Sequence, residues 1–125
     1  MKGLKTLIKL RQRELDKLRQ NLGKLEEELR SLITEEKRLG AELEAEIKLA
    51  AENPEMAQFF GQFAQGIEHK QDQIRALASE VNKAIANMQR EITDAFGELK
   101  RLEIARDNFE AEQEAKQAHR EALEL

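Results

Sequence analysis

The first fifty residues repeat apolar side chains at alternating steps of four and three residues. Ten of the twelve positions are apolar, and the exceptions are Arg11 and Glu36. Such a repeat predicts a long helix that buries one stripe against another helix, as in a coiled coil. The repeat consists of Leu4, Ile8, Arg11, Leu15, Leu18, Leu22, Leu25, Leu29, Leu32, Glu36, Leu39 and Leu43, and we expect it to continue through Ile47 and Ala50.

Composition excludes most alternatives to a helical fold. Ala, Glu, Leu, Lys and Arg account for 75 of the 125 residues, a bias typical of long helices and coiled coils. Valine occurs once and threonine three times, whereas sheets are rich in β-branched and aromatic residues. We therefore predict an all-α chain.

One short break, at residues 51–55, interrupts the helical pattern. It contains the only proline, Pro54, which suits the first position of a helix. Asn53 before it is a favourable N-cap, and Glu55 suits the first helical turn. The sequence predicts one helix over about 3–50, a turn at about 51–54 and a second helix over about 54–122.

The second segment carries its own apolar stripe, which thins beyond Leu102. Two consecutive four-residue steps, from Leu77 to Val81 to Ile85, predict a stutter that locally unwinds a supercoil. The predicted stripe comprises Phe60, Phe63, Ile67, Lys70, Ile74, Leu77, Val81, Ile85, Met88, Ile92, Ala95 or Phe96, Leu99 and Leu102.

The two stripes fit an antiparallel coiled-coil hairpin. A turn near residues 51–54 pairs residue i with roughly residue 105 − i, so Leu4 falls near Leu102. The second stripe fades where the first helix has no more residues to offer, which favours a hairpin over a parallel dimer. We expect one domain over residues 1–125, with the last ~20 residues prone to fraying unless a partner binds them. Because such a hairpin buries one stripe per helix, we also expect self-association or a partner to stabilise it.

Charge is distributed unevenly along a chain whose formal net charge is −4. Residues 1–20 carry a net charge of +5 and residues 101–125 carry −3. Both values oppose the helix dipole, but they complement each other if a hairpin places the two ends together. The modest total argues against general binding to nucleic acid.

No catalytic or cofactor motif emerges. The chain has no cysteine, and His69 and His119 lie too far apart for the common zinc spacings. Gly61 and Gly66 have the outer spacing of a phosphate loop, but no lysine follows them, so close helix approach is the better interpretation. We expect neither an enzyme nor a cofactor.

Nothing in the sequence predicts export or insertion into a membrane. Three lysines interrupt the apolar residues among the first ten, so no signal-peptide core forms. No run approaches the ~18 apolar residues of a membrane span. We expect a soluble cytoplasmic protein.

Two segments invite a functional interpretation. Phe59, Phe60 and Phe63 follow the break; Phe59 and Phe60 point about 100° apart on a helix, so one seam cannot bury both. The three either cap the hairpin or present a contact to a partner. Residues 2–19 form a basic helix that could bind nucleic acid or an anionic membrane. Its apolar side is already used by the seam, however, which favours charges that face the second helix or a protein partner.

Several segments resemble the FliJ family of flagellar type III export proteins. Leu4 to Arg11 and Glu14 to Arg19 are similar to the start of that family. The short break, the segment Phe60 to Phe63 followed by Ile67-Glu68, and the charged segment from Lys100 onward also resemble it. Some members carry tyrosines on the first helix, where this chain has Glu36 and Gly40.

The resemblance implies a coiled-coil stalk, similar to the gamma subunit of rotary ATPases, that binds a hexameric export ATPase, a membrane export-gate protein and export chaperones. It implies that the end bearing both termini enters the ATPase pore, and that a surface near the break contacts the gate. The implied ATPase-binding residues are Lys5, Lys9, Arg11, Arg13, Leu99, Arg101 and Arg106, and the implied gate-binding residues are Phe60, Phe63 and Ile67.

The alternative is a chaperone or scaffold hairpin, prefoldin-like or of helical-bundle type, without a flagellar role. It would oligomerise through exposed apolar residues such as Phe59 and Phe109. A synthetic or fragment coiled coil is a third interpretation, against which the glycines and the polar seam residues argue.

Overall fold

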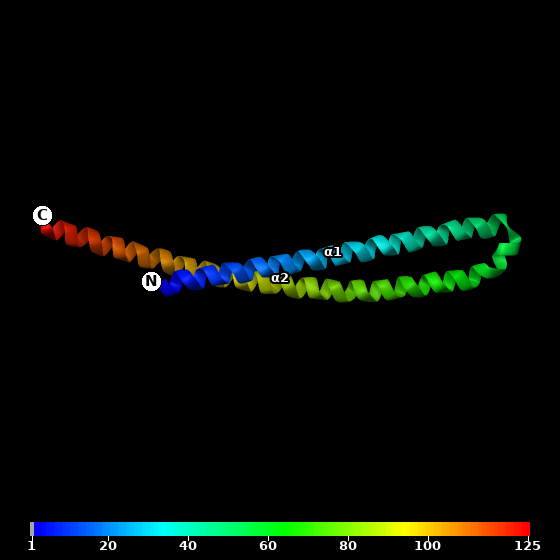
Figure 1. Ribbon diagram of the computed structural model, residues 1–125, viewed down its shortest axis with the longest axis horizontal. Helices are drawn as coiled ribbons and strands as arrows, with labels where there is room; N and C mark the ends of the chain where they lie inside the picture. The colour runs from blue at the N-terminus through cyan, green and yellow to red at the C-terminus, as the bar shows by residue number, and fades with distance from the viewer. Residues whose placement is uncertain (1) are drawn as a thin grey trace. The chain divides into compact units, whose positions relative to one another are not determined.

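The computed structural model describes residues 2–125, and two long α-helices contain nearly all of them (Figure 1). Helix α1 spans Lys2–Glu52 and helix α2 spans Pro54–Glu124. They form the predicted antiparallel hairpin, and residues 2–125 contain no strand. Each helix end lies within two residues of its predicted position.

Asn53 alone joins the two helices. Its N–H donates a hydrogen bond to the carbonyl of Leu49 at 2.9 Å, which closes the last turn of α1. Its own carbonyl accepts a bond from the N–H of Met56 at 3.1 Å, and its side-chain Oδ1 accepts one from the N–H of Glu55 at 3.2 Å. The predicted N-cap is therefore confirmed. No residue that the structure describes has a positive φ, so the turn needs no glycine.

Replacing Asn53 with alanine should lower the free energy of unfolding by about 1 kcal/mol, because only the side-chain cap is lost. Urea unfolding measures the change as a lower midpoint concentration, while the dependence of the free energy of unfolding on urea concentration stays the same. Asn53→Asp keeps an acceptor at the same position and should stay close to the parent. An equal loss in both variants would contradict a capping role.

The hairpin contains two compact units, and each is built from both helices. The terminal unit comprises the residues up to Asn21 together with Met88–Leu125, and the turn unit comprises Leu22–Asn87. The terminal unit buries one cluster, formed by Ile8, Leu15 and Leu99. Partly buried residues pack against this cluster, namely Leu4, Ile92, Ala95 and Leu102.

The turn unit buries Leu39, Ile67 and Val81, and Leu39 is only 1% exposed. These three residues and the buried cluster of the terminal unit all lie on the predicted stripes. No polar or charged side chain among residues 2–125 is buried. The core of each unit is narrow because each helix offers one apolar face.

The observed stripe on α2 differs from the predicted one at two positions. Leu77 is 56% exposed and Lys70 is also exposed, whereas Gln71 and Ala78 are half-buried. The predicted stutter is therefore wrong, because the inward positions 67, 71, 74, 78, 81 and 85 keep an unbroken alternation of four and three. Two helices that stay in contact require this spacing, so a glutamine and an alanine occupy the seam while a leucine lies outside it.

The same alternation of four and three residues determines which side chains face the seam at the C-terminal end of α1. Glu46 is half-buried there, whereas Ile47 is 50% exposed. The predicted step from Leu43 to Ile47 is therefore wrong, and the repeat continues through residues 43, 46 and 50.

The pairing within the turn unit also differs from the predicted one. Arg75 Nε bonds to Glu36 Oε1 at 2.8 Å, and Gln71 Nε2 lies 3.9 Å from the position of a Cβ on Gly40. The predicted pairing of residue i with residue 105 − i would instead place residue 69 opposite Glu36 and residue 65 opposite Gly40. Two features explain the shift along α2. The first turns of α2 cross over before the helix runs antiparallel to α1 (Figure 1), and side chains on a helix lean toward its N-terminus.

Helix α2 continues past the start of α1 (Figure 1). Every residue from Glu110 to Leu125 is exposed. The uncovered C-terminal segment agrees with the expectation that the apolar stripe of α2 ends where α1 no longer faces it.

Candidate functional site

A groove in the terminal unit brings basic side chains of both helices together. Lys5 and Lys9 from α1 and Arg106 from α2 line it, and its volume is about 410 Å³. Ile8 and Gln12 of α1 also contribute to the lining. Positions 5, 8, 9 and 12 share one face of a helix, so the sequence spacing alone groups the α1 residues.

The groove is not purely basic. Asp107 and Glu110 of α2 also line it, and Arg106 Nε lies 3.2 Å from Asp107 Oδ1. The sequence pattern did not single out these carboxylates, although Glu110 lies four residues after Arg106 and so shares its helix face. They place negative charge in the groove with Lys5 and Lys9, which is the complementarity that the charge distribution predicts.

The other implied ATPase-binding residues do not line this groove. Arg11 donates a hydrogen bond to Glu14 Oε2 at 2.9 Å. That bond and the charge of Glu14 raise the pKa of Arg11, with a smaller contribution from Glu98. Leu99 is 5% exposed and belongs to the buried cluster, whereas Arg13 and Arg101 are exposed. The exposed members of this predicted set are therefore Lys5, Lys9, Arg13 and Arg101.

Aromatic residues line a second hollow, which lies in the turn unit and has a volume of about 110 Å³. Phe59 is 59% exposed, whereas Phe60 and Phe63 are half-buried. The prediction that one seam cannot bury both Phe59 and Phe60 is confirmed. We call this hollow the aromatic hollow; its lining consists of Glu46, Ala50, Met56, Phe59, Phe60 and Phe63.

Ile67, the third implied gate-binding residue, is 3% exposed and belongs to the seam. Gly61 and Gly66 lie on either side of Phe63 in the sequence. An added Cβ would meet nothing within 4 Å at either glycine. The expectation that these glycines permit close helix approach is therefore wrong.

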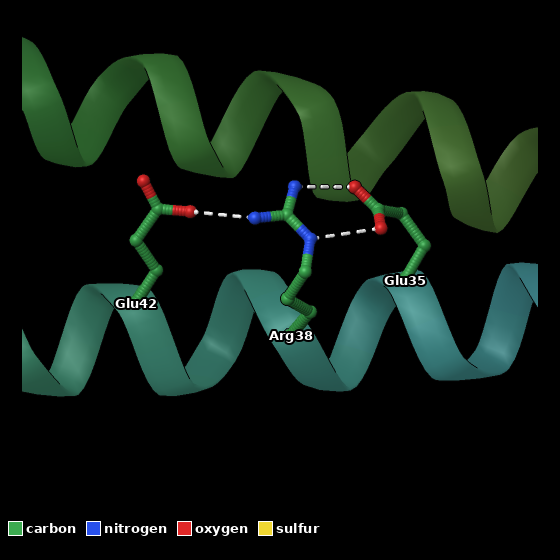
Figure 2. A network of polar contacts seen from close by, with 3 residues as sticks. All are labelled: Glu35, Arg38 and Glu42. Carbon is green, nitrogen blue, oxygen red and sulfur yellow. Dashed lines mark hydrogen bonds and ion pairs between the residues drawn. The ribbon is translucent and has the colours of Figure 1, made fainter.

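Arg38 lies between two carboxylates on one face of α1, as Figure 2 shows. Its Nε and Nη2 donate to Glu35 Oε2 and Oε1 at 2.9 and 2.6 Å, and its Nη1 donates to Glu42 Oε2 at 3.2 Å. The hydrogen bond between Arg38 and Glu35 lowers the pKa of Glu35 and raises the pKa of Arg38. The residue that follows Glu35, Glu36, pairs with Arg75 of α2.

The lowered pKa of Glu35 makes its contact with Arg38 sensitive to acid. A carboxyl group whose pKa falls on folding stabilises the fold above its unfolded pKa, and that stabilisation is lost as pH falls through the folded pKa. Glu35→Gln should lower the Tm slightly at about pH 7, and the difference should be smaller at about pH 2, because protonation of the carboxyl group as pH falls through its lowered pKa removes the ion pair. A Tm difference of the same size at both pH values would contradict this assignment.

Other kinds of site find no support in the described structure. No three His, Cys, Asp or Glu side chains among residues 2–125 lie close enough together to hold a metal ion. Over the same part of the chain, neither helix has a stretch both long and apolar enough to cross a membrane. Comparison with family models, curated proteins and solved structures finds no match. A functional proposal therefore rests on the two surfaces and on the segments that resemble a known family.

Proposed function

We propose that this chain is a FliJ-type coiled-coil stalk of the flagellar export apparatus, located in the cytoplasm beside the membrane export gate. The terminal unit would enter the pore of a hexameric export ATPase, and the chain would carry no catalytic activity of its own. The groove that gathers Lys5, Lys9 and Arg106 in this unit is the observation that carries the proposal.

The chemistry of the terminal unit supports this role. Its buried apolar residues form one cluster in the seam, and Lys5, Lys9 and Arg13 are exposed outside that seam. Exposed Lys5, Lys9 and Arg13 would attract acidic side chains around a pore, and such complementarity accelerates and orients association. A two-helix rod also suits a pore, because it presents side chains around its whole circumference.

The proposal extends to the turn unit, where Phe60 and Phe63 would contact the export gate. Ile67 is covered by α1, so its contribution would be to hold the seam beneath these aromatic residues. Recycling of export chaperones belongs to the same proposed role.

The ATPase contact is tested by titrating purified hexameric export ATPase with an excess of the folded chain. Lys9→Glu combined with Arg13→Glu should weaken binding about tenfold or more, because both exposed charges are reversed. Arg11 is left intact because it is bonded to Glu14. Lys48→Glu combined with Lys83→Glu makes the same charge change in the turn unit and is the matched control. Equal binding by both double variants, or none by the parent, would contradict the proposal.

A chaperone or scaffold hairpin is the second candidate, and the exposure of Phe59 favours it. Phe109, its other expected contact, is half-buried. Light scattering separates the two candidates. A stable multimer that Phe59→Ala dissociates supports the scaffold, whereas a monomer supports the stalk.

A further inference from the structure

The turn unit contains a run of residues unlike the rest of the chain. Charged residues make up 37% of the sequence, yet none occurs from Met56 to Ile67. This run of twelve residues holds three of the five phenylalanines and supplies most of the lining of the aromatic hollow. Its lack of charge distinguishes it from the solvated faces elsewhere on both helices.

Exposed apolar side chains from both helices accompany this run. Met56 and Phe59 of α2 are 49% and 59% exposed, and Ile47 and Leu49 of α1 are 50% and 48% exposed. The aromatic hollow, at about 110 Å³, is much smaller than the roughly 300 Å³ at which small-molecule pockets begin. It has the size for one inserted apolar side chain, and exposed apolar groups of this kind mark protein contacts.

Acidic residues accompany the exposed apolar ones. Residues 44–55 contain four glutamates and one lysine, and Glu46 lines the aromatic hollow. Glu55 lies four residues before Phe59, and Glu52 lies three after Leu49, so each shares a helix face with an exposed apolar residue. Helix α2 has no lysine or arginine before Lys70. The local charge therefore repels an anionic surface and attracts a basic one.

We infer that the aromatic hollow, together with the exposed Met56 and Phe59 beside it, forms a surface that docks a helical segment of a protein partner. The segment carries an apolar face flanked by lysine or arginine. One apolar side chain of the segment would enter the aromatic hollow, and its flanking cations would face Glu46, Glu52 and Glu55. Helices dock into apolar grooves in this way, through a few spaced anchors. A second copy through the same surface and an anionic membrane are poorer occupants, because each would bring negative charge against these glutamates. The inference rests on the contact proposed for the turn unit and deepens it, because it states the chemistry of the segment that Phe60 and Phe63 would meet there.

The test uses the full chain and a fluorescent synthetic helix of about 14 residues built from leucine and lysine. A leucine–glutamate peptide of the same length is its charge control. We expect the lysine peptide to bind with an affinity that falls as salt rises, and the glutamate peptide not to bind. Phe59→Ala should weaken binding about tenfold, because it removes the most exposed aromatic anchor.

Matched variants separate this surface from general attraction to an acidic protein. Ile104→Ala removes an apolar side chain of similar exposure, 57%, from the terminal unit and should leave the affinity unchanged. Glu46→Gln with Glu55→Gln should weaken binding and flatten its salt dependence. Circular dichroism confirms that each variant keeps its helix content.

Three results would overturn the inference: equal affinity for the two peptides, an unchanged affinity in Phe59→Ala, or Phe59-dependent sedimentation of the chain with phosphatidylglycerol vesicles. The assay contains no ATPase, so its failure would leave the stalk proposal standing. Loss of the ATPase contact would likewise leave this surface standing.

Discussion

Leu39→Ala should lower the free energy of unfolding by about 2–5 kcal/mol. Leu39 is the most completely buried side chain of the turn unit, at 1% exposure. A two-helix seam has no second layer of side chains that could move in to fill the space left by the missing atoms, so the cavity cost adds to the lost burial. Chemical unfolding followed by circular dichroism measures the loss, as a lower midpoint at a similar slope.

Leu77→Ala is the matched control for this prediction, because it makes the same chemical change on a leucine that is 56% exposed. Its effect should stay within about 0.5 kcal/mol, as for most surface substitutions. The comparison also tests the observed repeat on α2. A stutter would place Leu77 inside and Ala78 outside, so similar losses for Leu39→Ala and Leu77→Ala would contradict the unbroken seam.

Leu99→Ala should destabilise the terminal unit by a similar amount, about 2–5 kcal/mol. Leu99 is 5% exposed and belongs to one cluster with Ile8 and Leu15. Removing its side chain opens a space in the only buried cluster of this unit, among the residues that the structure describes. Hydrogen exchange should then show lower protection for residues 2–21 and 88–109.

Hydrogen exchange also gives the control for Leu99→Ala. Ile104→Ala removes an exposed apolar side chain from the same helix and unit, and should leave the exchange rates near those of the parent. Exchange reports local opening as well as global unfolding, so protection in the turn unit should fall less. Equal loss of protection in both units would show that the chain unfolds as one body and would contradict a local effect.

The fold was readable because periodicity carries most of the information in a coiled coil. All six buried apolar residues in the described part of the chain, residues 2–125, lie at positions that the apolar repeat predicts, from Ile8 in α1 to Leu99 in α2. The turn was readable from Asn53 and Pro54, because capping and the geometry of proline are local properties. Three predicted seam positions were wrong, namely Lys70, Leu77 and Ile47. The continuous contact of two helices required Gln71, Ala78 and Glu46 instead, although apolar character favoured Leu77 and Ile47.

The candidate sites were less readable. The antiparallel topology brought the start of α1, with Lys5 and Lys9, close to the part of α2 that carries Arg106. The pairing rule itself placed residues 100 and 96 opposite the two lysines. The sequence did not reveal Asp107 and Glu110 as part of that groove, since charged residues cover most exposed faces of both helices. The resemblance also did not distinguish buried residues from exposed ones. It grouped Leu99 and Ile67 with the contact residues, yet both are buried. A family-like motif does not separate side chains that build a surface from side chains that support it.

The unbroken alternation in both helices limits how the length of this chain can vary. One inserted residue turns the following part of a helix by about 100°, which carries its apolar face out of the seam. Seven inserted residues restore the face but advance that helix by about 10 Å, so the opposite helix needs seven more residues to stay in step. Longer or shorter proteins of this architecture should therefore differ by matched heptads, one in each helix at equal distances from Asn53.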